Sequence, residues 1–346
     1  MDRIGSLRTV VVLVVGSAVV AACSGGDDSL GAPVMTGTSE TAAVAAPTSS
    51  RAPTTVAASG KGLAWRFVDF VDPTRPAVEV RDLDGNVVLE DLTVRAIPTV
   101  VVYEGADGGG EDAEFADLQP RPLVIWVKGF GGMQTGREPI LSALVEAGYV
   151  VAAPNSPDVS GRRAQLSAYR EQPGDVTAVL NSLLDPSDGV ADDLAGLIDE
   201  GRIAVAGHSI GASAALAGVF HECCRDDRLD AAVAFGVVPQ RGFGDGEFVF
   251  AGAPLLLVHG TADRLAPVRG AVDVLAEAAP PAFLFEIDGA DHFTPVFGDG
   301  TSTLGPAVYS IVVEFLDAFV AGTSHPDDLA RVAQSSSIGT WFSAER

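Results

Sequence analysis

The feature that most constrains the fold is a strand, a turn and a helix in direct succession over residues 202–222. The apolar run at 202–206 predicts a buried strand, and the small residues of 210–222 predict a helix. Between them stands Gly207-His208-Ser209-Ile210-Gly211, which leaves little chain for the reversal. Glycines two positions before and after the serine are needed because side chains there would collide with the strand and the helix. We therefore expect Ser209 at a sharp, strained turn, with its hydroxyl raised above a sheet.

Short apolar runs alternate with helical stretches along most of the chain. The predicted strands are 63–71, 86–103, 123–127, 149–153, 202–206, 229–238, 254–259 and 282–287. The predicted helices are 138–147, 172–184, 210–222, 268–278 and 304–320. Continuous apolar strands that alternate with helices indicate an α/β fold with a mostly parallel central sheet flanked by helices. We expect one such domain over residues 61–322, with its site at the carboxyl ends of the strands, and a peripheral tail at 323–346.

A serine hydroxyl needs a general base before it can act as a nucleophile. The chain has five histidines, and His292 lies in a loop directly after the last predicted strand, where such a base is required. His259 ends a strand and is expected to be a packing or capping residue. The other three lie inside the turn, at a helix end and in the tail. We therefore predict His292 as the base.

The acid that orients the base is expected between the serine and the histidine along the chain. Asp263 fits this order, because it follows the predicted strand at 254–259 and precedes His292 by 29 residues. Asp245 is the alternative, in a glycine-rich loop one strand earlier. Asp291 adjoins the base in sequence and cannot easily face its ring, so we expect it to be a solvated loop residue.

Two backbone N–H groups are candidates for binding the oxyanion that forms during acyl transfer. Ile210 follows the serine at the start of a helix, where N–H groups lack acceptors. The second donor is expected from the glycine-rich loop Lys128-Gly129-Phe130-Gly131-Gly132, and Phe130 is the candidate by position. Its ring is also placed to line an acyl pocket.

The N-terminus has the pattern of a secretory signal. Two arginines precede an apolar run at 9–20, which is shorter than the roughly 20 residues of a membrane-spanning helix. The run ends at Cys23 in a context that resembles the lipobox of bacterial lipoproteins. We expect a signal peptide at 1–22, lipidation of Cys23, and a disordered Ser/Thr/Ala/Pro/Gly-rich tether over 23–60. The protein is then anchored outside the cytoplasm in a bacterial cell envelope, or simply secreted if Cys23 is incidental.

The chain carries 46 acidic and 22 basic residues, a formal net charge of −24. Such a surface repels the phosphates of nucleic acids and anionic lipids, so neither is expected as a ligand. Membrane contact is expected only through the anchor. We expect a monomer that needs no cofactor.

Cys223 and Cys224 are adjacent. Neighbouring Cα atoms lie about 3.8 Å apart across a trans peptide, whereas disulfides usually need more than about 4.4 Å. A strained vicinal disulfide and two free buried thiols therefore both remain open. A metal site is not expected, because only His221 stands nearby and the ligand set is incomplete.

Taken together, the turn around Ser209, the loop at 128–132, and the segments that carry Asp263 and His292 resemble the α/β-hydrolase superfamily over residues 63–322. The chain is also similar to bacterial secreted hydrolases described as dienelactone-hydrolase-like or platelet-activating-factor-acetylhydrolase-like. The segments that carry this similarity are FVDFVDPTRP at 67–76, EQPGDVTAVLNSLL at 171–184 and CCRDDRLDAAV at 223–233. Such relatives often have a histidine in place of Lys128. The GHSIG, TADRLAP and DHFTP segments are similar to those of cutinase-type polyester hydrolases.

This resemblance implies a serine carboxylic ester hydrolase with the triad Ser209, Asp263 and His292. Dienelactone hydrolases proper have a cysteine where this chain has Ser209, so their specific reaction is not expected. The expected substrate is a small-molecule, lipid or polymer ester. The alternatives are a cutinase-like polyester or lipid hydrolase, an acyltransferase and, more remotely, a non-catalytic binding lipoprotein that has kept the fold.

Overall fold

The computed structural model describes residues 61–75, 94–131, 134–157, 159, 166–185, 194, 196–238, 242–298 and 303–344 of the chain. The predicted signal peptide at 1–22, the predicted lipidation site Cys23, the tether and the first part of the predicted strand at 86–103 lie outside these residues.

Within the described residues, ten strands form one sheet. Across the sheet they are β10 (Gly339–Ser343), β9 (Ala282–Ile287), β8 (Leu255–Gly260), β7 (Ala231–Phe235), β6 (Ile198–His208), β4 (Arg121–Val127), β5 (Val150–Pro154), β2 (Arg95–Gly105), β1 (Gly62–Asp72) and β3 (Gly110–Glu111). The central strands from β9 to β5 are all parallel to their neighbours. At the two sides, β10, β2 and β1 pair antiparallel. The expected α/β class is confirmed, and the sheet is mostly but not wholly parallel.

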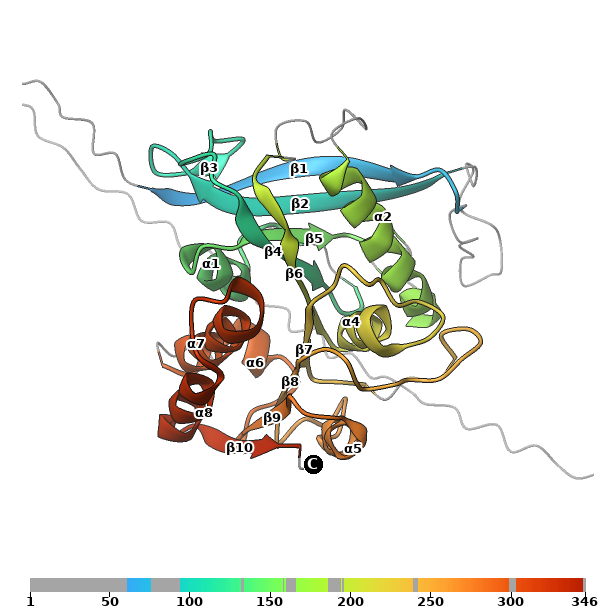
Figure 1. Cartoon of the computed structure of the whole chain (residues 1–346), viewed down its shortest axis with the longest axis vertical. Coiled ribbons are helices and arrows are strands. Elements are labelled where there is room, and N and C mark those ends of the chain that lie inside the picture. Colours follow the sequence, from blue (N-terminus) through green and yellow to red (C-terminus); the bar gives the residue numbers. More distant parts are fainter. Residues whose placement is uncertain are drawn as a thin grey trace, which may run out of the picture. The chain divides into compact units, whose positions relative to one another are not determined.

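Helices cover both faces of this sheet (Figure 1). One face carries α1 (Pro139–Glu146), α6 (Thr294–Phe297), α7 (Leu304–Leu316) and α8 (Pro326–Ser335). The other carries η2 (Leu166–Glu171), α2 (Gln172–Leu184), α4 (Ile210–Phe220) and α5 (Arg269–Glu277). Alternate residues of one strand enter the two cores: Leu123 and Ile125 pack on one face, Val124 and Trp126 on the other. Burial on both faces explains why the central strands are apolar throughout instead of alternating.

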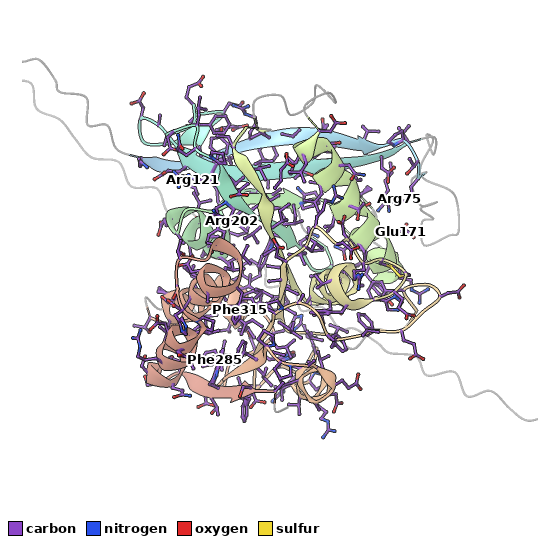
Figure 2. The ribbon with its side chains drawn as sticks, in the orientation of Figure 1. Arg75, Arg121, Glu171, Arg202, Phe285 and Phe315 are labelled. Atoms are coloured by element: carbon purple, nitrogen blue, oxygen red, sulfur yellow. A yellow bond between two sulfur atoms is a disulfide. The ribbon has the colours of Figure 1, made fainter. Side chains whose placement is uncertain are left out.

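The helix formed by α7 and the following η4 (Asp317–Ala321) is the one helix in the described part of the chain that is long and apolar enough to cross a membrane. Its apolar side chains pack inside the domain: Val308, Ile311 and Phe315 are buried in the core. Phe285 of β9 and Phe315 belong to this same core, and Figure 2 labels both side chains. We therefore interpret it as a core helix of the domain.

The structure departs from the expected peripheral tail after Gly322. Helix α8 buries Leu329 and Ala333, and β10 extends the sheet by pairing antiparallel with β9. The ring of Trp341 in β10 stacks on Phe283 of β9, with 5.0 Å between centroids. The apolar residues of α8 form only one narrow stripe, and β10 is short and largely exposed. The local sequence pattern therefore predicted neither element clearly.

Candidate active site

The reversal between β6 and α4 has the geometry that the sequence predicts. Ser209 adopts φ +60° and ψ −125°, a left-handed conformation that costs free energy for a residue with a side chain. A Cβ atom on Gly207 would lie 2.3 Å from the carbonyl oxygen of Gly211. A Cβ on Gly211 would lie 2.3 Å from the carbonyl oxygens of Val127 and Lys128. Both glycines are therefore required for α4 to pack this closely on the sheet.

Helix α4 begins immediately after the serine. Its residues are all buried, and all of them except the terminal Phe220 are small or aliphatic. Ile210 is the first helical residue, so its N–H has no acceptor within the helix. This end of the helix also carries the positive side of the helix dipole. The N–H beside Ser209 is thus available to a negatively charged oxygen.

His292 pairs with Asp263 at the carboxyl ends of β8 and β9. The two are joined by a hydrogen bond of 2.6 Å from His292 Nδ1 to Asp263 Oδ2. The other carboxylate oxygen, Oδ1, accepts from the backbone N–H groups of Leu265 (2.9 Å) and Ala266 (2.8 Å). Burial alone raises the pKa of Asp263, but the hydrogen bonds from Ala266 and His292 outweigh it and hold that pKa below its ordinary value. Asp263 is therefore an ionised partner for the imidazole.

The two other aspartates that the sequence suggested lie elsewhere. Asp245 is exposed in its loop and lies outside the pocket that contains His292. Asp291 uses its Oδ1 to accept from the N–H groups of Phe293 and Thr294, at 3.0 and 2.9 Å, so it caps the start of α6. Of these three carboxylates, the structure brings Asp263 to the histidine.

Two further histidines contact this pair, and sequence reasoning assigned neither of them a part in the site. His208 Nε2 lies 2.8 Å from the carbonyl oxygen of His292. Burial lowers the pKa of His208 to about 4, so the ring is neutral at pH 7 and donates from Nε2. His259 Nε2 lies 2.7 Å from the carbonyl oxygen of Ala266 and 3.3 Å from Asp263 Oδ2. His259 is a packed residue as predicted, and its spacing of four from Asp263 is the signal that links it to the acid.

A cavity of about 580 Å³ contains Ser209, His292, Phe130 and Ile210 in its lining. Four large apolar side chains in its lining are each at least half exposed: Phe130, Leu265, Phe293 and Phe297. Hydrogen bonds between a catalytic serine and histidine are often long before substrate binds and shorten in the complex.

The loop after β4 lies against the serine. A Cβ atom on Gly129 would be 3.1 Å from the Cβ of Ser209, so the backbone approaches closely there. Gly131 has φ +76°, a conformation that favours glycine. Phe130 is part of the cavity lining, as predicted, and Gly132 lies outside the described residues.

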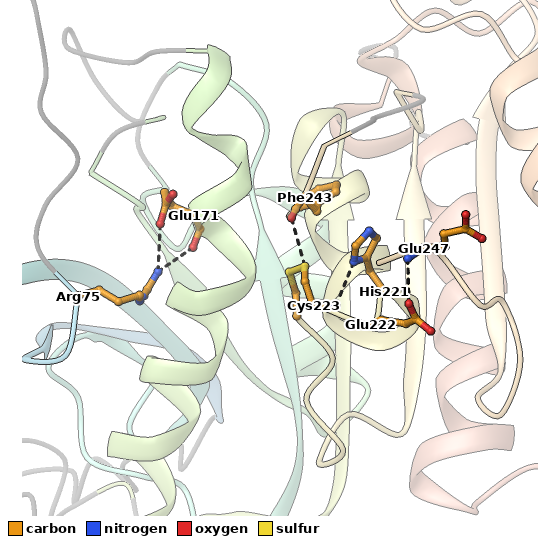
Figure 3. The surroundings of a disulfide bond; sticks show 8 residues. Arg75, Glu171, His221, Glu222, Cys223, Phe243 and Glu247 are labelled. Carbon is orange, nitrogen blue, oxygen red and sulfur yellow. Dashed lines mark hydrogen bonds and ion pairs between the residues drawn. A yellow bond between two sulfur atoms is a disulfide. The ribbon is translucent and has the colours of Figure 1, made fainter. Parts of the chain in front are cut away.

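The adjacent cysteines form a vicinal disulfide, the first of the two alternatives left open above. Figure 3 shows its surroundings: Cys223 N–H donates to His221 Nδ1 (3.2 Å), and Cys223 Sγ contacts the carbonyl oxygen of Phe243 (3.3 Å). The donor atoms of His221, Cys223 and Cys224 lie within 4.8 Å of one another. With both sulfurs in the disulfide, this group offers no thiolate to a metal. None of the three residues lines the cavity at Ser209.

Comparison with known proteins supports the fold. No family model matches the chain, and no curated protein matches it. Among solved structures, the chain is similar to the ferulic acid esterase from Streptomyces cinnamoneus, with a TM-score of 0.58 and 18% sequence identity. The match covers 83% of this chain and 96% of that chain. At this identity the likeness shows an α/β-hydrolase-like fold and nothing narrower.

Proposed function

We propose that this chain is a carboxylic ester hydrolase that acts through a Ser–His–Asp triad. The observation that carries the proposal is the meeting of two independent features in one cavity. Ser209 stands at a strained turn directly before helix α4 and lines the cavity. His292, which is hydrogen-bonded to Asp263, lines the same cavity. A packing role explains neither the strain at Ser209 nor a buried histidine–carboxylate pair beside it.

In the first half of the reaction, Ser209 Oγ attacks the ester carbonyl carbon while its proton passes to His292 Nε2. The tetrahedral intermediate then expels the alcohol oxygen, which takes that proton from His292 and leaves an acyl group on Ser209. In the second half, water attacks the acyl carbonyl and gives a proton to His292. His292 returns it to Ser209 Oγ as the carboxylic acid departs. These steps need no cofactor.

Asp263 and the backbone donors stabilise the charges that arise. The carboxylate keeps the His292 proton on Nδ1, so that Nε2 is free to accept, and it stabilises the imidazolium that forms. The N–H groups of Phe130 and Ile210 bind the oxyanion. Each such donor contributes about 10²- to 10³-fold to kcat in serine hydrolases.

The cavity lining favours an ester with a sizeable apolar or aromatic part. Its exposed Phe130, Leu265, Phe293 and Phe297 stay in contact with water until something apolar covers them. An aromatic acyl ester, such as the feruloyl group for which the structural neighbour is named, fits this description. So does a polyester or lipid chain, and the same observation therefore favours cutinase-like hydrolysis as the second candidate.

The test is hydrolysis of p-nitrophenyl esters from acetate to palmitate and of methyl ferulate, with the full chain beside Ser209→Ala. We expect turnover in the parent that falls by at least about 10⁴-fold in the variant. The chain-length profile separates a small aromatic substrate from a long aliphatic one. A folded parent that hydrolyses none of these esters, and whose serine resists a fluorophosphonate probe, contradicts the proposal and favours a binding protein.

We also propose that Cys23 carries a lipid that attaches the enzyme to the envelope, because the sequence before it has the lipobox pattern. Mass spectrometry of the protein purified from a bacterial host that processes lipoproteins tests this. A diacylated Cys23 in the parent and soluble release of Cys23→Ser support it, whereas an unmodified cysteine contradicts it.

A further inference from the structure

The side chain of Lys128, directly after β4, is buried with 5% of its surface exposed. Its Nζ donates to the carbonyl oxygens of Gly129 (2.8 Å), Gly131 and Val159 (3.3 Å). An ammonium group has three N–H donors, so each one has an acceptor here. Among the residues that the structure describes, no carboxylate is hydrogen-bonded to this ammonium, and its three acceptors are backbone carbonyl groups.

This arrangement determines which way the neighbouring peptide faces. In a planar trans peptide the C=O and the N–H point in opposite directions. The carbonyl of Gly129 points to Lys128 Nζ, and the N–H on the same peptide belongs to Phe130. The Phe130 N–H must therefore point away from the lysine. The next N–H, that of Gly131, is already engaged with the carbonyl oxygen of Val159 at 2.9 Å.

The peptide between Gly129 and Phe130 is also the one that lies beside the serine. A Cβ on Gly129 would be 3.1 Å from Ser209 Cβ, and both Gly129 and Phe130 line the cavity. The donor that points away from Lys128 therefore belongs to the peptide that approaches Ser209. Without the lysine, the carbonyls of Gly129 and Gly131 would be left without this donor, and the peptide would gain freedom to rotate.

We propose that Lys128 is a positioning residue of the oxyanion hole: its ammonium holds the carbonyls of Gly129 and Gly131 so that the Phe130 N–H stays aimed at the oxyanion. This inference rests on the proposed ester hydrolysis and adds a residue to it. Burial lowers the pKa of Lys128 to about 8, so the group is still largely charged at pH 7. Its positive charge behind the loop also favours negative charge on the substrate oxygen.

Lys128→Met tests this, because it keeps the length of the side chain and removes the donors and the charge. We expect kcat to fall by roughly 10²-fold, similar to the loss of one oxyanion donor, while KM changes by less than about threefold. The matched control is Lys61→Met, since Lys61 is the chain's other lysine and is paired on the surface with Glu104 at 2.7 Å. It should keep the parent's kcat.

A second readout separates positioning from mere support of the fold. A boronic acid forms a tetrahedral adduct on a catalytic serine and mimics the transition state, so its inhibition constant should rise by the same factor as kcat/KM falls. Binding of the carboxylic acid product should not change. Lys128→Gln, which keeps a shorter neutral donor, should lie between the parent and Lys128→Met, and it serves as the test if Lys128→Met does not fold.

The outcomes are distinguishable. If the parent has no esterase activity and Ser209 is not labelled by a fluorophosphonate, the proposed function itself fails. If the parent is active and Ser209→Ala is not, but folded Lys128→Met or Lys128→Gln keeps the parent's kcat and boronate affinity, the inference about Lys128 is overturned. A loss confined to KM would also overturn it, because the lysine would then serve substrate binding alone.

Discussion

Replacing Asp263 by asparagine should disable the base without disturbing its surroundings, and the hydrogen bonds show why. Oδ1 of Asp263 accepts from the N–H groups of Leu265 and Ala266, while Oδ2 faces His292. In Asp263→Asn, the two backbone donors keep the remaining side-chain oxygen on their side. The amide NH₂ must then face His292 and donate to its Nδ1. The imidazole proton then resides on Nε2, and this nitrogen can no longer accept the serine proton.

The expected loss follows from two effects. The first is the lost attraction between carboxylate and imidazolium, about 4 kcal/mol for charge centres about 4 Å apart at an effective dielectric constant of about 20. This alone corresponds to about 10³-fold in kcat. The second is the unfavourable tautomer, and replacing the corresponding aspartate of a serine protease by asparagine lowers kcat by about 10⁴-fold. We expect kcat to fall between about 10³- and 10⁴-fold, with KM nearly unchanged.

The assay is steady-state hydrolysis of p-nitrophenyl acetate by the parent, Asp263→Asn and Asp245→Asn, with thermal unfolding of all three. Asp245 is exposed, so its variant is the control and should keep the parent's kcat. A folded Asp263→Asn that retains more than about a tenth of the parent's kcat would refute the reasoning. So would a large loss in Asp245→Asn, since that would assign the acid to the other loop.

Four further predictions concern stability and specificity. His208 has a pKa of about 4 in the folded chain and about 6.5 in the unfolded chain. Between these values the unfolded state binds more protons, so the free energy of unfolding must fall as the pH drops. Urea unfolding at about pH 7 and about pH 4.5 should show a smaller loss of this free energy in His208→Asn than in the parent. Gly211→Ala should lower the free energy of unfolding by about 1–3 kcal/mol, because its Cβ would meet the carbonyl oxygens of Val127, at the end of β4, and of Lys128. The control is Gly196→Ala, where an added Cβ meets nothing within 4 Å, and equal stability of the two variants would contradict the packing argument. Asp175→Asn should lower stability by about 3 kcal/mol because the carboxylate faces a buried arginine of β2 at 2.9 Å; chemical unfolding that shows no change would disprove this. Leu265→Asp should lower kcat/KM for palmitate relative to acetate by about tenfold, and an unaltered ratio would remove the side chain from the substrate path.

Much of the fold follows from local patterns. The helix at 172–184 and the strand at 282–287 have the bounds that the sequence predicts, because apolar periodicity and turn residues act within a few positions. Local patterns do not predict the structure of the segment after Gly322. β10 is a strand because β9 offers it an unpaired edge, and no pattern within 339–343 describes that edge.

The candidate site divides in the same way. Ser209 and His292 were predictable because a strand–turn–helix and a loop after the last strand are local features. The sequence favoured Asp263 over Asp245 by position, but both follow strands in the required order, and only the folded chain shows Asp263 within 2.6 Å of the histidine. The sequence likewise left a vicinal disulfide and two free thiols as alternatives, and the structure shows the disulfide.

The sequence by itself therefore determined an α/β sheet with a serine at a sharp turn and a histidine after the last strand. The tertiary structure brought Asp263, the acid that the sequence favoured, to that histidine. It alone showed that His208 binds the backbone carbonyl of His292 and that Lys128 is enclosed by three carbonyl oxygens. The physical reason is that strands, helices and turns depend on neighbours along the chain. A hydrogen bond between loops depends on where the whole sheet places their ends.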